Sequence, residues 1–209
     1  MKINAFSSDP HILARRGASD CDRIFYGGHG RMTDDRILHF VPFGAERLNG
    51  DGVYLPSVFS SDEAIDEAIE LVLRGVPVIA SCCLTLDEVG TCDKKFGVTP
   101  IGLAHKYGLL GENTYIAGAV YLDKDDIDLI VQSGAKVVLT PSDSMGNGCG
   151  IPPLRMLCTL GAEVYLGTGS GEYDEDADMD FEERLLRLSV SGALCTKDPV
   201  PDDLIRGLR

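Results

Sequence analysis

The sequence contains no tryptophan and only four histidines, and it has no apolar run of about 18 residues. A membrane-spanning helix is therefore not expected. The first 23 residues include Asp9, Arg15 and Arg16, and they lack the continuous apolar core of a secretory signal. From these absences we expect a cytoplasmic protein that does not act at a membrane.

Paired metal ligands are also missing. Seven cysteines are present, but no two have the Cys-x-x-Cys spacing of a zinc site or a redox motif. The histidines stand singly, without a His-x-His or His-x-x-x-His pair. An odd number of thiols without a secretory signal is typical of reduced cysteines inside a cell. The residues alone thus predict no structural metal site.

Basic residues are scarce relative to acidic ones. The chain has 19 lysines and arginines against 33 aspartates and glutamates, which gives a net charge of −14. Such a surface repels polyanions, so neither nucleic acid nor an anionic membrane is an expected partner. The remaining composition, 44% hydrophobic and 25% charged over 209 residues, is that of one globular domain with its own core.

From residue 60 onward, short apolar runs alternate with segments of helical periodicity. The runs are continuous apolar stretches, which is typical of buried strands in a parallel sheet. Asp123 is a suitable N-cap for one helix, and Gly134 is a suitable residue to end it. Including two earlier runs, the predicted strands are 23–26, 36–41, 76–83, 114–120, 137–140 and 164–168. One predicted helix opens within Ser60–Glu63 and is ended by Gly75, and the others are 101–107, 124–133, 152–160 and 181–190.

These elements predict one domain over residues 1–209. Residues 1–21 are predicted to be an N-terminal arm with a short helix around 11–16, and residues 22–59 an irregular region with two short strands. Residues 60–192 carry the βα repeats, and residues 193–209 form a tail. Alternation of strands and helices in this way is found in barrels and doubly wound sheets.

Several segments share their order and spacing with one known family. Gly75-Val76-Pro77 precedes the strand that ends near Ser81, and an acidic helix start follows Ala117–Leu122. Pro141–Pro153 carries Pro-Ser and Gly-x-Gly-x-x-Pro, and Leu166–Gly169 has the sequence Leu-Gly-Thr-Gly. Over roughly residues 77–188 the chain resembles the fifth to eighth strands of the amidohydrolase superfamily, in its cytosine-deaminase and triazine-chlorohydrolase branch. The resemblance implies a TIM-type barrel with its site at the carboxyl ends of the strands.

The same resemblance implies a divalent metal such as zinc or iron, held by histidine and aspartate side chains, that activates a bound water. Here Ser81 stands at the position of the fifth-strand histidine, and Gly118 at that of the sixth-strand histidine. Gly169 replaces the eighth-strand aspartate, and Leu84 replaces the carboxylate that handles protons. A first-strand His-x-His is not found, as expected if the chain starts beyond that part of the barrel. We therefore expect no metal cofactor and no hydrolysis by this chain alone.

By resemblance, a set of residues at the strand ends is expected to line a residual pocket: Ser81, Gly118, Ser142, Asp143, Ser144 and Gly169. For residues 142–144, turn formation and helix capping are equally good explanations.

Cys82 and Cys83 also lie at a strand end and are weak candidates for a catalytic nucleophile. A reactive thiol needs a nearby base or cation, and neither cysteine has a histidine within local reach. Packing as small core residues is therefore the favoured interpretation.

A glycine-rich loop and an acidic run are each better explained by structure than by a binding site. His29 and Arg31 lie in a glycine-rich loop, but its spacing is not that of a phosphate-binding loop, and a plain turn is favoured. The acidic run over residues 172–180 lacks the spacing of a calcium loop. A solvated loop that supplies negative charge to the start of the next helix explains this run better.

The predicted fold is α/β: a partial (βα) TIM-type barrel equivalent to the C-terminal half of a metal-dependent hydrolase barrel. Because a half barrel exposes the edges of its outer strands, we expect a homodimer or a heteromer with a related amidohydrolase chain. The leading hypothesis is a non-catalytic subunit, scaffold or binder of a small heterocyclic ligand. The alternatives are a hydrolase or deaminase that is active through a partner chain or through Cys82 or Cys83, and a truncated remnant of an amidohydrolase.

Overall fold

The computed structural model describes residues 3–7, 23–26, 34, 37–42, 52–55, 57–59, 62–169, 172–173, 176–197 and 199–201. The loop with His29 and Arg31, the predicted helix around 11–16 and the last part of the predicted tail lie outside these residues. Within the described residues, no helix is long and apolar enough to cross a membrane.

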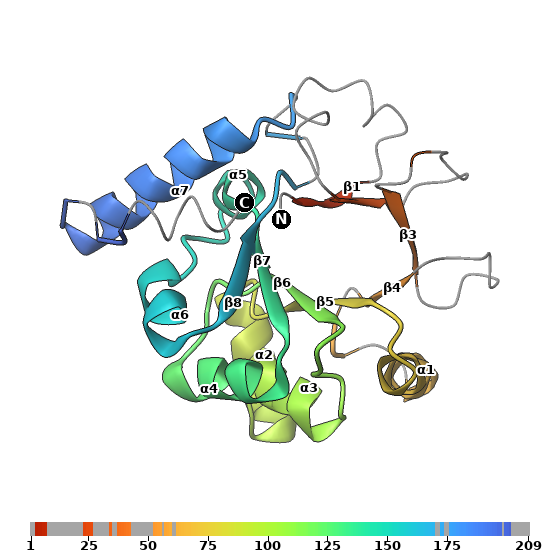
Figure 1. Ribbon diagram of the computed structural model, residues 1–209. Coiled ribbons are helices and arrows are strands. Elements are labelled where there is room, and N and C mark those ends of the chain that lie inside the picture. Colours follow the sequence, from red (N-terminus) through yellow and green to blue (C-terminus); the bar gives the residue numbers. More distant parts are fainter. Residues whose placement is uncertain are drawn as a thin grey trace.

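Eight parallel strands form the sheet, and each strand pairs with the next one along the chain. In Figure 1 they curve around a common centre from β1 to β8. Sequential parallel pairing of this kind is the strand order of a βα barrel. The strands are β1 (Ile3–Ser7), β2 (Arg23–Tyr26), β3 (Ile37–Pro42), β4 (Gly52–Leu55), β5 (Val78–Cys82), β6 (Thr114–Gly118), β7 (Lys136–Leu139) and β8 (Glu163–Leu166).

The described helices follow β4 and lie mainly outside the arc of strands (Figure 1). Helix α1 contacts β4 and β5, whereas α6 and α7 contact β8. Their bounds are α1 (Asp62–Leu73), α2 (Leu86–Phe96), α3 (Pro100–Lys106), α4 (Lys124–Ser133), α5 (Pro141–Gly146), α6 (Leu154–Leu160) and α7 (Met179–Leu194).

The two faces of the strands lie in different surroundings. Ala80 and Cys82 of β5 belong to the large core between the sheet and the helices. Ile79, between them in sequence, packs with Val138 of β7 in a separate small cluster inside the barrel. This division follows from the two-residue period of a strand, which sends alternate side chains to opposite faces. The inner face of the sheet is therefore not covered by the helices, and its side chains can line a cavity.

The prediction of an α/β partial barrel is confirmed, but the sheet has more strands than we expected. Residues 3–7, predicted to lie in an arm, form β1, and residues 52–55, predicted to lie in a loop, form β4. Both strands are too short to show a clear alternation of apolar and polar residues, and pairing with neighbours defines them. Because β4 pairs with β5, the edge of β5 is covered by the chain itself.

Two helices were also not predicted. Helix α2 begins after Thr85, whose side chain accepts a hydrogen bond from the backbone N–H of Glu88 at 3.1 Å, and ends at Gly97 in the left-handed conformation. Helix α5 occupies Pro141–Gly146, which we expected to be a loop. Proline is well tolerated in the first turn of a helix, where its missing N–H has no helical partner to lose.

Candidate functional site

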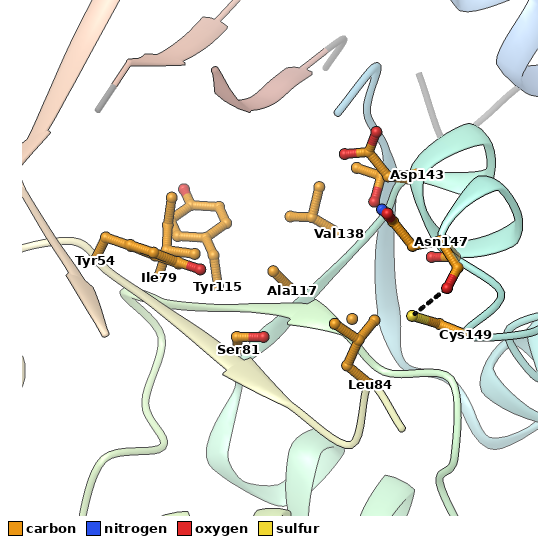
Figure 2. A pocket seen from close by; sticks show the side chains of 13 residues that line it. Tyr54, Ile79, Ser81, Leu84, Tyr115, Ala117, Val138, Asp143, Asn147 and Cys149 are labelled. Carbon is orange, nitrogen blue, oxygen red and sulfur yellow. Dashed lines mark hydrogen bonds between the residues drawn. The ribbon is translucent and has the colours of Figure 1, made fainter. Parts of the chain in front are cut away.

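A cavity of about 250 Å³ lies at the carboxyl ends of β5, β6 and β7. Parallel βα folds place their sites at this end of the sheet. Four of the predicted pocket residues are among its lining, namely Ser81, Gly118, Asp143 and Ser144, whereas Ser142 and Gly169 are not. The full lining, drawn in Figure 2, is Tyr54, Ile79, Ser81, Leu84, Tyr115, Ala117, Gly118, Val138, Thr140, Asp143, Ser144, Asn147 and Cys149.

Apolar and aromatic side chains form one part of the cavity. Ile79 and Val138 are buried on the inner face of the sheet, with Tyr54 and Tyr115 packed against them. Figure 2 shows both tyrosines together on one side of the cavity. Burial raises the pKa of Tyr54, so its hydroxyl keeps its proton and remains available for hydrogen bonding.

Polar groups lie on the opposite side, on α5 and the residues after it (Figure 2). The backbone of this helix holds them in place: Ser144 N–H donates to Thr140 O at 2.9 Å, and Asn147 N–H donates to Asp143 O at 3.0 Å. The hydroxyl of Tyr173 donates to Asn147 Oδ1 at 3.1 Å. The cavity therefore joins an aromatic wall to a polar wall, the usual composition of a small-molecule site.

Ser142 lies in a buried contact behind the cavity. Its backbone N–H donates to Oε2 of Glu182 at 2.9 Å, and its hydroxyl donates to Oε1 of the same carboxylate. Glu182 is fully buried on α7. The short helix α5, which carries Asp143 and Ser144, is thereby fixed to the longest described helix of the chain.

Gly169 gives space to a residue that does line the cavity. A Cβ atom added at Gly169 would lie 2.3 Å from Oδ2 and 2.6 Å from Cγ of Asp143. Its φ of +64° is also in the left-handed region, where side chains are disfavoured. The carboxylate of Asp143 therefore occupies the space that a side chain at position 169 would need.

Gly118 also has limited space for a side chain. It pairs with Cys82 in the sheet, and its φ is +90°. A Cβ atom there would lie 3.1 Å from Cys82 O and 3.2 Å from the Cβ of Leu84. A larger side chain, such as a histidine, would be strained in this backbone conformation, and the Cys82 carbonyl and Leu84 would have to shift by a few tenths of an ångström to admit it.

The backbone has an unusual conformation just after β5 and β6. Cys83 after β5 and Ala119 after β6 both have positive φ, at 55° and 52°. The two turns are joined, because the N–H groups of Val120 and Tyr121 donate to Cys83 O at 3.0 and 2.9 Å. Each such residue costs on the order of 1–3 kcal/mol, and strain of this kind gathers at functional sites.

Cys82 and Cys83 belong to the core. Both are fully buried. Burial raises the pKa of each thiol well above its ordinary value, and the negative charges of Glu88 and Asp126 add to the effect. A thiol in these surroundings keeps its proton and is a poor nucleophile.

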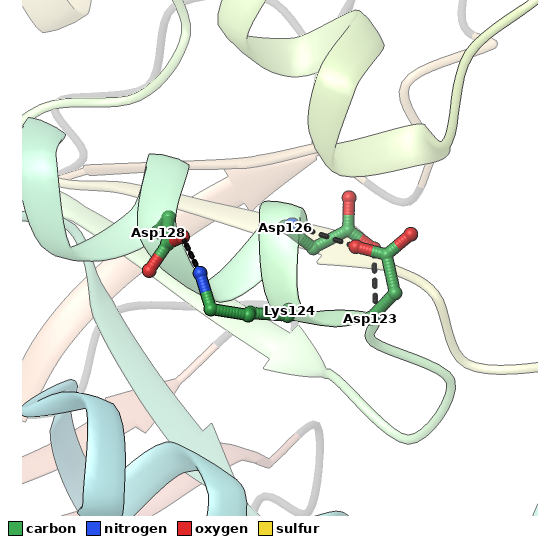
Figure 3. Close-up of polar contacts among 4 residues, drawn as sticks. All are labelled: Asp123, Lys124, Asp126 and Asp128. Atoms are coloured by element: carbon green, nitrogen blue, oxygen red, sulfur yellow. Dashed lines mark hydrogen bonds and ion pairs between the residues drawn. The ribbon is translucent and has the colours of Figure 1, made fainter.

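Asp126 helps to cap the N-terminus of α4, the helix that follows β6. Asp123 and Asp126 exchange side-chain and backbone hydrogen bonds at 2.8 and 3.2 Å, which forms the capping box shown in Figure 3. Lys124 adds an ion pair with Asp128 at 2.6 Å. Burial raises the pKa of Asp126, and a hydrogen bond from the hydroxyl of Thr99 opposes that rise. The prediction that Asp123 caps this helix is confirmed.

The acidic run before α7 has a capping role where it is described. The side chain of Asp178 accepts hydrogen bonds from the N–H groups of Asp180 and Phe181 at 2.8 and 3.3 Å. This contact agrees with our interpretation that the run supplies negative charge to a helix start.

The residues at the strand ends do not fit a divalent metal. Ser81, Gly118 and Gly169 offer no imidazole or carboxylate, and the Asp143 carboxylate fills the space beside Gly169. Among the residues that the structure describes, no group of three histidine, cysteine, aspartate or glutamate side chains is arranged to hold a metal ion.

Several lining residues were not identified from the sequence. Tyr54 was missed because β4 was predicted to be a loop. Tyr115 shares a face with Ala117, and the alternation within Thr114–Gly118 would have indicated that they line the same surface. No sequence signal points to the contact between Asp143 and Gly169, because it depends on how two loops meet.

Comparison with known proteins identifies the class. The amidohydrolase family matches residues 42–193, and the chain belongs to that family. The segments expected to be its fifth to eighth strands are indeed the fifth to eighth strands of the sheet.

Among individual proteins, the chain is similar to 5-methylthioadenosine/S-adenosylhomocysteine deaminases. It is 36% identical to the enzyme of Pyrococcus furiosus over 113 residues, which are 54% of this chain and 27% of that protein. It is 29% identical to the enzyme of Dictyoglomus thermophilum over 139 residues, which are 66% of this chain and 32% of that protein. The matched segments thus span about a third or less of these relatives.

Solved structures share the fold. An adenosine deaminase from Xanthomonas campestris with bound zinc superposes with a TM-score of 0.73 at 13% identity, covering 93% of this chain and 61% of that one. Atrazine chlorohydrolase from Arthrobacter aurescens, complexed with zinc, gives a TM-score of 0.61 at 19% identity, covering 92% and 49%.

Proposed function

We propose that this chain binds a small heterocyclic molecule in the strand-end cavity and does not hydrolyse it through a metal centre. One observation carries the proposal. A cavity lies at the strand ends, while the positions that the family resemblance assigns to metal ligands hold Ser81, Gly118 and Gly169, and the Asp143 carboxylate occupies the space beside Gly169.

The composition of the cavity supports a binding role. Apolar groups and two tyrosines supply contact area, and side-chain hydroxyl, amide and carboxylate groups give direction to a ligand. A volume of about 250 Å³ suits a molecule the size of a base or an amino-substituted ring. The names of the similar deaminases and of the similar atrazine chlorohydrolase suggest nucleosides and triazines as the first ligands to test.

The proposal is tested by calorimetric titration of protein dialysed against EDTA with 5-methylthioadenosine, adenosine and atrazine. We expect at least one of them to bind, and we expect it to be recovered unchanged. A bound ligand at a hundred times its Kd should add about 2.7 kcal/mol to the free energy of unfolding.

Two substitutions test whether the ligand binds in this cavity. Ala117→Leu fills part of the cavity and should abolish binding, whereas Ala193→Leu, exposed on α7, makes the same change away from it. Binding that survives Ala117→Leu, or that requires added zinc, would contradict the proposal.

A further inference from the structure

The cavity carries a negative charge and no basic residue. Asp143 is on its polar wall, and none of the residues that line it is a lysine, arginine or histidine. Figure 2 places the Asp143 carboxylate on the side opposite Tyr54 and Tyr115. A ligand lying between these walls would meet a carboxylate at one end and aromatic rings at the other.

Contacts within the protein hold the Asp143 carboxylate in place. Helix α5, which bears Asp143, is fixed by the buried contact between Ser142 and Glu182. The absence of a side chain at Gly169 leaves the space in which the carboxylate lies, 2.3 Å from the position of a Cβ atom there. Asp143 is thus positioned by two separate parts of the chain, one after β7 and one after β8.

The aromatic wall also favours positive charge. The face of a tyrosine ring attracts cations, by about 0.5–1 kcal/mol at exposed sites and more where water is excluded. Tyr54 and Tyr115 supply two such rings, both half-buried. The net charge of −14 further raises the concentration of cations near the protein.

We infer that the ligand of this cavity is a small organic cation, in which a protonated amine donates to the Asp143 carboxylate while its ring or alkyl part packs against Tyr54 and Tyr115. The inference rests on the proposed binding function and adds the charge of the ligand to it. A carboxylate has about four lone-pair sites, so Asp143 accommodates a ligand in addition to its contacts within the protein.

Three probes of equal size and different charge test the inference. Benzylamine is cationic at pH 7, benzyl alcohol is neutral and benzoate is anionic. In titrations followed by NMR, we expect benzylamine to bind at least about tenfold more tightly than benzyl alcohol, since hydrogen bonds between charged groups exceed neutral ones by about 1 kcal/mol or more. Benzoate should not bind measurably. Equal binding of benzyl alcohol or benzoate would overturn the charge preference and leave the binding site intact. No binding by any of the three probes would overturn the inference, whereas the proposed function fails only if the heterocycles of its own titration do not bind.

Substitution of the carboxylate completes the test. Asp143→Asn keeps the size of the side chain and removes its charge, so it should weaken benzylamine binding about tenfold or more and leave benzyl alcohol unchanged. Asp93→Asn removes one exposed carboxylate from α2, away from the cavity, and serves as the control for overall charge. Equal effects of the two variants on benzylamine would show that net charge alone attracts the probe, and would overturn the role of Asp143.

Discussion

At the scale of the residue, the surroundings of Gly118 and Gly169 bear on whether a metal ligand could stand at either position. Loss of a ligand by itself would leave an open space at positions 118 and 169. Instead, Leu84 and the Cys82 carbonyl border one position, and the Asp143 carboxylate fills the other. A side chain at position 169 would therefore clash with Asp143, and one at position 118 would press on the Cys82 carbonyl and Leu84.

The contact between residues 143 and 169 can be measured as a coupling energy. Gly169→Ala should lower the free energy of unfolding by more than about 1 kcal/mol, because it adds a Cβ at positive φ and displaces Asp143. In an Asp143→Ala background the steric part of this cost should disappear. A double-mutant cycle by urea denaturation should give a coupling of about 0.5–3 kcal/mol. Additive effects would contradict the packing described here.

The buried thiols predict how stability depends on pH. Burial raises the pKa of Cys82 well above its ordinary value of 9.0, so the folded protein keeps this proton where the unfolded chain releases it. The folded state then holds more protons, and its stability falls as pH rises above about 9, by at most about 1.4 kcal/mol per pH unit for one thiol.

Measuring the free energy of unfolding between pH 8 and 10 tests this dependence. Cys82→Ala should make the decline less steep, while removal of the exposed Cys195 is the matched control. An unchanged slope in Cys82→Ala would show that the thiol titrates freely in the folded protein.

At the scale of the element, the contact between α5 and α7 holds the polar wall of the cavity. Ser142 supplies two donors to the buried Glu182 carboxylate. Ser142→Ala removes one of them and should cost about 1.5–3 kcal/mol in the free energy of unfolding, since the bond is to a charged group out of contact with water. Ser189→Ala removes a hydroxyl bond to Leu186 O on the same helix and should cost less. Equal losses in the free energy of unfolding would contradict a larger contribution of the Glu182 contact to stability.

Elements with strong local signals could be predicted from the sequence, and those held by distant contacts could not. The capping residues Asp123 and Gly134 predicted α4 to its last residue. In contrast, β1 and β4 are four or five residues long and exist because neighbouring strands pair with them. Helix α2 had a usable signal in Thr85 and Gly97 that was overlooked. The positions of Ser81, Gly118 and Asp143 at the cavity followed from the order of the strands, whereas the contribution of Tyr54 required β4.

At the scale of the whole molecule, the surface suggests association with another chain. Among the described residues, β8 pairs with β7 and β1 with β2, and each has a pairing recorded on one side only. Leu188 and Leu194 of α7 are 71% and 42% exposed, and Leu194 borders an apolar groove of about 510 Å³ shared with α6. Exposed apolar patches of this kind are common at interfaces.

We therefore predict a homodimer or a complex with a related amidohydrolase chain. Sedimentation velocity should show a dimer of the purified chain at micromolar concentration. Leu194→Lys should shift it towards monomer, whereas Leu86→Lys, equally apolar and exposed on α2, should not. A monomer at all concentrations, with no gain in mass on mixing with a full-length relative, would contradict the prediction.

The central claim is that this amidohydrolase fold retains its pocket without the means to activate water on a metal. The most direct test is to incubate the purified chain with zinc, remove the excess, and measure bound metal together with ammonia released from 5-methylthioadenosine. The account predicts zinc well below one equivalent and no ammonia above the uncatalysed background. Stoichiometric zinc accompanied by deamination that chelation abolishes would contradict it.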